Sequence, residues 1–186
     1  MLANLLRPLS VLAGVAISVP GAVAQDPPKP LVTRNQVRLN LKGAEVILAA
    51  AREKATEMKL TVNIAVVDDG GHLVAFARMD GARPGSATTA QTKATAAATF
   101  RQATGPLPAK GEPDLLLSLG LPMAAAASGG KATALLGGVP IVVDGQVIGA
   151  VGVGGGTGEQ DAVVARAGIQ ALLKAIESES KPGPSK

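Results

Sequence analysis

The chain has 186 residues, of which 47% are hydrophobic and 17% charged, so it has enough apolar material for one folded domain and is not disordered over most of its length. It contains no Cys, which excludes thiol nucleophiles, disulfides, thiolate zinc sites, iron–sulfur clusters and covalent haem attachment through a C-x-x-C-H motif. It also has no Trp or Tyr, and its net charge of +4 is scattered along the chain, so it lacks the stacking residues and basic patches of nucleic-acid-binding proteins.

The first 24 residues have the pattern of an export signal. Arg7 precedes an apolar run from Leu9 to Val19, and Ala22-Val23-Ala24 fits a small-residue cleavage site. We therefore expect a cleaved signal peptide over residues 1–24 and a periplasmic or secreted protein. The alternative is an uncleaved anchor helix, but the run is shorter than the ~20 apolar residues that cross a bilayer, and no later segment predicts a membrane span.

The expected folded domain covers residues 35–177. Residues 25–34 contain three prolines and are expected to form an extended linker. Residues 178–186 are polar and are expected to form a disordered tail.

A helix and a hairpin are expected first in this domain. Apolar residues recur at helical spacing over residues 40–59, which predicts an amphipathic helix. Two β-branched-rich strands follow, Val62–Val67 and His72–Met79, with a turn at Asp68–Gly71. Both strands are apolar at nearly every position, so we expect the hairpin to be covered on both faces.

The middle of the chain predicts a second helix over residues 85–102, with Ser86 as its N-cap. Its alanines form one stripe that would allow close packing on a sheet, and its threonines form a second stripe, either a solvated face or a functional one. Residues 104–123 contain four prolines and predict a long connection with a short helical turn at 114–119.

Three strands are expected in the last part of the domain, at 132–136, 139–143 and 147–153, and Gly and Asp-Gly turns separate them. Thr157 and Gln160 match a capping box that opens a final helix. Because hairpins connect most of the strands, the order predicts an α+β fold: a five-stranded antiparallel sheet with helices packed on it.

A cluster of glycines between the last strand and the last helix is the first candidate site. Backbone N–H groups of Gly154, Gly155 and Gly156 would cradle an anion; alternatively, these glycines only permit a sharp turn and a close backbone approach. The cluster matches neither G-x-G-x-x-G nor the P-loop motif, so the sequence does not predict nucleotide binding there.

His72 is the only histidine, so a multi-histidine metal site cannot be built from one chain. It is either a plain residue at a strand start or a single axial ligand or general base. The adjacent Asp68 and Asp69 suit a turn better than a catalytic carboxylate pair.

Several cations are further candidates. Arg78 and Asp80 are close enough in sequence to pair, and Arg83 would grip a carboxylate. Lys93 lies in an otherwise uncharged helix, where it is either solvated or directed toward a partner.

Several segments together resemble the GlcG/HbpS family of haem-binding proteins, over nearly the whole chain from Val37 to Ile176. These segments are Val66–Ala75, Arg78–Ala82, Lys93-Ala94, Gly137–Ile141, Gly149–Val153 and Gly158–Asp161. The resemblance implies a profilin-like three-layer fold, a homo-oligomer and non-covalent haem. It also implies an axial ligand that differs among relatives, being either a histidine near the first helix or a threonine before the GG-x-P strand.

This chain has no histidine in its first helix, and it offers Lys131 and Thr133 near the other position. The leading hypothesis is therefore an exported haem-binding protein that captures, buffers or senses haem in an apolar cleft. The candidate cofactor-binding residues are His72, which is also the candidate metal ligand, and Arg78, Lys93, Lys131, Thr133, Gly154, Gly155 and Gly156.

Two alternatives remain. One is an enzyme or enzyme accessory that acts on a small carboxylic (2-hydroxy) acid, with His72 as base and Arg78 or Arg83 as clamp. This interpretation rests on the metabolism in which relatives of the family take part. The other is a structural oligomer whose Gly-rich and Ala-rich surfaces make subunit contacts.

Overall fold

The computed structural model describes residues 31–32, 34–127 and 129–180. The chain divides into two units, Met1–Arg34 and Asn35–Lys186, and the elements below belong to the second. The predicted signal peptide lies outside the described residues, as do residues 25–30 and 33 of the predicted linker and residues 181–186. The elements are α1 (Leu41–Glu57), β1 (Asn63–Asp68), β2 (Leu73–Arg78), α2 (Gly85–Thr99), α3 (Leu115–Ala127), β3 (Gly138–Val143), β4 (Gln146–Gly154) and α4 (Gly158–Glu179).

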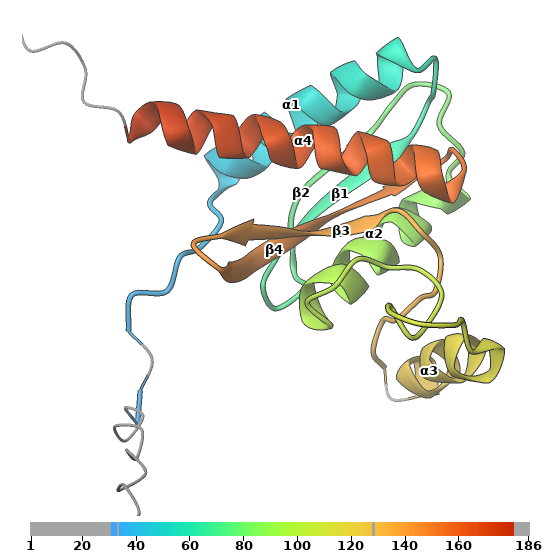
Figure 1. Ribbon diagram of the computed structural model, residues 1–186. Helices are drawn as coiled ribbons and strands as arrows, with labels where there is room; N and C mark the ends of the chain where they lie inside the picture. Colours follow the sequence, from blue (N-terminus) through green and yellow to red (C-terminus); the bar gives the residue numbers. More distant parts are fainter. Residues whose placement is uncertain (1–30, 33, 128, 181–186) are drawn as a thin grey trace, which may run out of the picture. The chain divides into compact units, whose positions relative to one another are not determined.

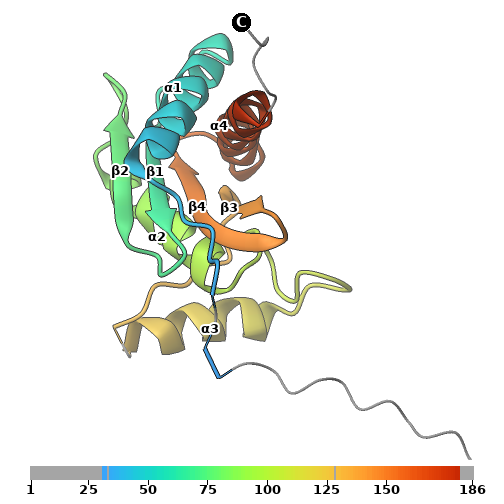
Figure 2. The same ribbon diagram turned by 90° about the vertical axis from the view of Figure 1, so that its left-hand side faces the viewer.

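The four strands form one antiparallel sheet with the order β2-β1-β4-β3. Helix α2 packs on one face of this sheet, and α1 and α4 pack side by side on the other, which gives three layers (Figures 1 and 2). The α+β class and the antiparallel sheet are thus confirmed. The profilin-like label stays a prediction.

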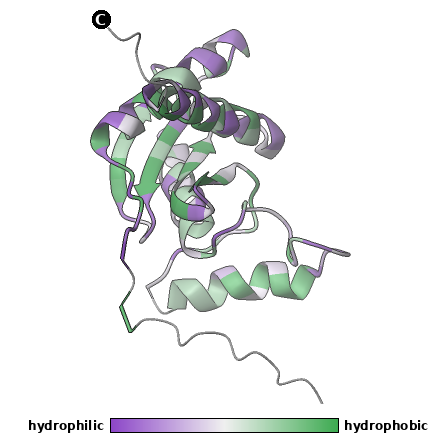
Figure 3. Ribbon diagram, turned by 60° about the vertical axis from the view of Figure 1, so that its left-hand side comes forward, coloured by the Kyte–Doolittle hydropathy of each residue, from purple (hydrophilic) through white to green (hydrophobic). Residues whose placement is uncertain are grey.

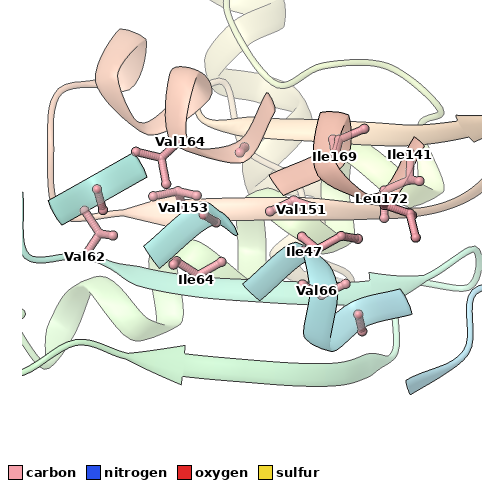
Figure 4. Packing of buried hydrophobic residues seen from close by; sticks show 14 of the residues in the cluster. Ile47, Val62, Ile64, Val66, Ile141, Val151, Val153, Val164, Ile169 and Leu172 are labelled. Atoms are coloured by element: carbon pink, nitrogen blue, oxygen red, sulfur yellow. The ribbon is translucent and has the colours of Figure 1, made fainter. Parts of the chain in front are cut away.

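The larger core lies between the sheet and the α1/α4 layer, and it consists of branched aliphatic side chains (Figure 4). Ile47 of α1 and Leu172 of α4 lie over Val66 and Val151, which point from neighbouring strands toward the same helices. Burial of such side chains contributes about 1.5 to 3 kcal/mol each.

The smaller core lies under α2 and consists almost entirely of alanine, with Ala65 and Ala150 of the sheet against Ala90, Ala94 and further alanines of the helix. Glycines in β4 complete this contact, since a Cβ at Gly152 would collide with the carbonyl oxygen of Ala90. The predicted close approach of this helix to a sheet is confirmed.

The strand predicted at 132–136 is wrong, so the described residues form four strands and not five. Thr104 explains this, because it already occupies the outer edge of β3: its N–H donates to the Gly138 carbonyl at 3.0 Å, and its hydroxyl accepts from the Gly138 N–H at 2.8 Å.

Four smaller predictions also need correction. Strand β1 is buried, but β2 lies at the edge of the sheet and is only partly covered, so the hairpin is not covered on both faces. The N-cap position of α2 is Pro84 rather than Ser86, and no side chain caps the helix with a hydrogen bond. The short turn predicted at 114–119 is the start of the 13-residue helix α3, and α4 extends to Glu179 into the predicted tail.

Candidate functional site

A cavity of about 340 Å³ lies between the first half of α2 and the glycine-rich loop that joins β4 to α4. We call it the Lys93 cavity. It brings together four of the eight predicted cofactor-binding residues, namely Lys93, Gly154, Gly155 and Gly156. Its other lining residues are Arg83, Ser86, Thr89, Leu135, Leu136, Gly158 and Asp161.

The glycines of this loop have a steric role. A Cβ at Gly154 would lie 2.8 Å from the Ser86 carbonyl oxygen of α2, so a larger residue would push the helix away. Gly155 has a φ of +144°, which only glycine adopts readily. The prediction that these glycines permit a sharp turn and a close approach is confirmed, and an anion-binding role stays a prediction.

Lys93 is buried, with 5% of its side chain exposed, so the prediction of a solvated lysine is wrong. Its Nζ donates to Asp161 Oδ2 at 2.7 Å and to the Val153 carbonyl oxygen at 2.9 Å. The other carboxylate oxygen, Asp161 Oδ1, accepts from the Gly156 N–H at 3.0 Å. This pair joins α2, β4 and α4 in the interior of the domain.

Asp161 is the partner that sequence reasoning missed. It lies in the first turn of α4, directly after a capping box that the structure confirms: Thr157 Oγ1 accepts from the Gln160 N–H, and the Gln160 side chain accepts from the Thr157 N–H. The sequence did contain a signal for such a partner, because Lys93 is a lone cation in an otherwise uncharged helix. If such a helix is covered on both sides, its cation is buried and requires a buried counter-charge.

Arg83 lies at the exposed rim of the Lys93 cavity. Its Nη2 donates to the Gly155 carbonyl oxygen at 3.4 Å, which is long for a hydrogen bond. Its own carbonyl oxygen accepts from Asn63 Nδ2 at 3.0 Å. Asn63 therefore fixes the backbone of Arg83, while the guanidinium group stays available at the rim.

His72 lies at the other end of the sheet. Asn63 pairs with Gly154 and Asp68 pairs with Gly149, so the turn that carries His72 is about 17 Å along the strand from the Gly154 end of the Lys93 cavity. The imidazole is 83% exposed, and its Nδ1 lies 3.3 Å from Asp68 Oδ1. Asp68 also accepts from the backbone N–H groups of Gly70 and His72, which confirms its role in the turn.

The other three predicted cofactor-binding residues, Arg78, Lys131 and Thr133, do not line the Lys93 cavity. Arg78 ends the edge strand β2, next to an open hollow that Arg52 and Asp80 also line, and it makes no ion pair with Asp80 within the described parts of the chain. Lys131 is exposed in the segment between α3 and β3. Thr133 lines a small cavity of about 20 Å³ and accepts from the Leu135 N–H at 3.1 Å.

Helix α3 forms an exposed apolar surface (Figure 3). It has no charged residue and makes almost no contacts with the other helices and strands. The structure buries only Ser118 of this helix, whose Oγ accepts from the Leu107 N–H at 2.9 Å. Its exposed large side chains are Leu115, Leu116, Leu117, Leu119 and Met123.

The described residues lack both a clustered metal-ligand set and a membrane-spanning helix. They contain no group of three or more His, Cys, Asp and Glu side chains arranged to hold a metal ion. No helix among them has both the length and the apolar character needed to cross a membrane.

The sequence is similar to a known protein family and to individual proteins. The model of a family described as "Haem degrading protein HbpS-like" matches residues 39–170. The chain belongs to this HbpS-like family. Among its relatives is protein GlcG of Escherichia coli, which is 44% identical over 120 residues that cover 64% of this chain and 84% of GlcG. An uncharacterized 15.0 kDa protein of Citrobacter freundii is 34% identical over 131 residues, which cover 70% of this chain and 89% of that protein.

Solved structures of the HbpS-like type share the fold. HbpS matches with a TM-score of 0.62 and 28% identity, over 78% of this chain and 98% of HbpS. The Klebsiella pneumoniae protein ORFY matches with a TM-score of 0.62 and 31% identity, over 78% of this chain and 98% of ORFY. PduOC, whose structure is a complex with heme, matches with a TM-score of 0.59 and 26% identity, over 73% of this chain and 95% of PduOC.

Proposed function

We propose that this chain is an exported protein that binds haem non-covalently and captures, buffers or senses it. The observation that carries the proposal is the match to the HbpS-like family together with the likeness to PduOC, which was solved as a heme complex. The absence of Cys is consistent with non-covalent binding, because no thioether bond to the haem can form. The signal-like first 24 residues support export.

The chemistry of His72 fits an iron ligand. Histidines that bind metals usually donate their second ring N–H to a carboxylate, which orients the ring. Asp68 is placed to do this at Nδ1, and Nε2 of the exposed ring is left for an iron atom. Lys131, Thr133 and the thioether of Met123 are the other candidate ligands, and Met123 is 72% exposed on α3.

The apolar face of a haem would fit best against α3. The Lys93 cavity has three charged and two hydroxyl side chains in its lining, and the cavity beside Thr133 is far smaller than a porphyrin. Helix α3, by contrast, has no charged residue and exposes several leucine side chains.

A homo-oligomer is part of this proposal. The large side chains of α3 expose on the order of 500 Å² of apolar surface, which is in the upper part of the range for the largest apolar patch of a monomer and more than half of what one partner contributes to a standard interface. In addition, the Lys93 cavity and Arg78 lie at the opposite end of the sheet from His72 within one copy of the chain.

A hemin titration followed by absorbance tests the proposal, since the chain has no Trp or Tyr for fluorescence quenching. We expect a saturable, sharpened Soret band, with serum albumin as the positive control. Comparison of His72→Ala, Met123→Leu, Lys131→Ala and Thr133→Val would identify the ligand, because only the ligand variant should shift the bound spectrum. A chain that leaves the hemin spectrum unchanged while albumin binds normally would refute haem binding.

A further inference from the structure

We propose that a cavity between the start of α1 and the end of α4 binds a free amino acid with an apolar side chain, held as its zwitterion. We call it the Arg38 cavity. Its volume is about 310 Å³, at the lower end of the range of about 300 to 1,000 Å³ of small-molecule sites. It shares no lining residue with α3, with the Lys93 cavity or with the turn that carries His72, so the inference does not rest on the proposed function.

The floor of the Arg38 cavity is continuous with the larger core. Ile148 of β4 and Leu172 of α4 belong to that core and also line the cavity. Gly43 of α1 and Ala175 of α4 line it as well, and neither carries a side chain large enough to fill the space between the two helices. An apolar group of a ligand would therefore lose its contact with water against side chains that the core already holds in place, which favours binding.

The mouth of the cavity carries charges of both signs. Lys42 of α1 and Glu179 of α4 approach each other at 3.8 Å, and both side chains are largely exposed. Arg38, which precedes α1, and Asp144, in the turn between β3 and β4, line the cavity and are exposed too. Among residues 31–32, 34–127 and 129–180, neither of these two side chains has a hydrogen-bond or ion-pair partner. One cation and one anion at the mouth are thus left for a ligand.

This balance of charge favours a zwitterion over an ion of one sign. The two cations and two anions of the lining cancel. A ligand with only a carboxylate would gain Arg38 but would also approach Asp144 and Glu179, and a ligand with only an ammonium group would meet the two cations. An amino acid carries both groups on one carbon atom, so each can lie beside its opposite charge. The guanidinium fork of Arg38 suits a carboxylate in particular, because it binds both oxygens at once.

The floor decides which amino acids fit. Its side chains are aliphatic, and those of Val46, Ile148, Leu172 and Ile176 are the largest that come from the helices and from β4. A polar side chain placed against them would lose hydrogen bonds to water without replacement, which is unfavourable. We therefore infer an amino acid with a branched aliphatic or aromatic side chain, for which L-leucine is a suitable probe.

Calorimetric titration of the full chain with four compounds tests this site. L-Leucine has the apolar group and both charges, 4-methylpentanoate has the same group with only the carboxylate, 3-methylbutylamine has it with only the ammonium group, and glycine has both charges without the side chain. We expect saturable binding of leucine at one site. The two singly charged compounds should bind about threefold to fivefold more weakly, as is typical of the loss of one exposed ion pair, and glycine should not bind measurably.

Variants of the mouth should separate the two charges. Arg38→Gln should weaken leucine about threefold to fivefold without weakening 3-methylbutylamine, because only the carboxylate loses its partner. Asp144→Asn should weaken leucine to a similar extent without weakening 4-methylpentanoate. Asn suits the positive φ of +49° at this position, so the turn is kept.

A variant of the floor tests the location. Val46→Phe places a larger side chain in the cavity and should abolish leucine binding. Val163→Phe makes the same substitution at a partly exposed residue of α4 outside the cavity, so it is the matched control and should bind leucine like the unmodified chain. Far-UV circular dichroism shows whether both variants fold, and the two charge variants test the site independently of that result.

Three outcomes would overturn the inference: no saturable leucine binding at millimolar concentration, unchanged leucine affinity in a folded Val46→Phe chain, or binding of either singly charged compound as tightly as leucine. A hemin titration of the same proteins keeps the two proposals apart. Leucine binding without any hemin binding refutes only the proposed function, and hemin binding without leucine binding refutes only this inference.

Discussion

Lys93 of α2 and Asp161 of α4 are 68 residues apart in sequence, and their charged atoms meet at 2.7 Å with both side chains almost fully buried. The pair connects the helix on one face of the sheet with a helix on the other, at the end of β4. Because Asp161 also holds the Gly156 N–H, this single contact fixes the loop that shapes the Lys93 cavity.

Removal of the cation from this pair should be strongly destabilising. Lys93→Met leaves the Asp161 carboxylate buried without its counter-charge, which costs about 3 to 5 kcal/mol in comparable pairs. The double variant Lys93→Met/Asp161→Leu should regain most of this free energy of unfolding, because an apolar pair of similar volume is often as stable as a buried ion pair. Urea unfolding followed by far-UV circular dichroism measures both. Equal stability of Lys93→Met and the unmodified chain would contradict the buried pair.

Substitution of a β4 glycine should also be costly. Gly152→Ala places a methyl group onto the Ala90 carbonyl oxygen, so α2 must move away from the sheet and the free energy of unfolding should fall by more than about 3 kcal/mol. Gly85→Ala, at the start of the same helix, is the matched control, since a Cβ there meets nothing within 4 Å. The control should be neutral or slightly stabilising. Similar thermal midpoints for the two variants would argue against the close helix–sheet contact.

Charge on α3 should reduce self-association. Leu116 is 83% exposed, and Leu116→Glu places a carboxylate in the apolar surface, where desolvation in an interface is unfavourable. We expect a lower molar mass by light scattering at equal concentration. Val163→Glu makes the same charge change at an exposed apolar residue of α4, 39% exposed, and should leave the mass unchanged. An oligomer that persists in Leu116→Glu, or a monomeric unmodified chain, would show that α3 is not the contact surface.

The pH dependence of stability should include a contribution from the start of α4. The pKa of Glu159 lies below its ordinary value of 4.5, chiefly because its carboxylate accepts a backbone N–H and also because the Thr157 hydroxyl bonds to it. A lowered pKa in the folded state means that this stabilisation is present above pH 4.5 and is lost as the pH falls through the lower folded value. The free energy of unfolding of Glu159→Gln, measured by urea unfolding at a series of acidic pH values, should therefore fall less steeply with decreasing pH than that of the unmodified chain. Parallel plots of unfolding free energy against pH for the two proteins would count against this contribution.

Much of the fold was predictable because it depends on local patterns. The amphipathic spacing of α1, the capping box at Thr157 and the alanine stripe of α2 each determine an element or a face before any long-range contact forms. The missing strand at 132–136 was not predictable in this way. Its apolar sequence suits a strand, but Thr104, more than 25 residues earlier, occupies the edge where it would pair.

The candidate site was predictable only in part, for the same reason. The glycines of the β4–α4 loop and Lys93 were identified from their sequence context, and the structure brings them together. The burial of Lys93 depends on Asp161, whose partner lies in another helix, and no local pattern reports that pairing. The separation of His72 from this cavity follows from strand register, which the sequence does not define until the strands are paired.

The contrast between the two cores has a consequence for how this chain tolerates sequence change. On the α1/α4 side, Ile, Val and Leu fill the space and can exchange with one another if the total volume is kept. On the α2 side, the contact consists largely of alanines and backbone, and a Cβ added at Gly138, Gly152 or Gly154 would collide with a carbonyl oxygen of α2. We therefore expect the fold to have one adaptable side and one fixed side, with the Lys93 cavity built on the fixed one.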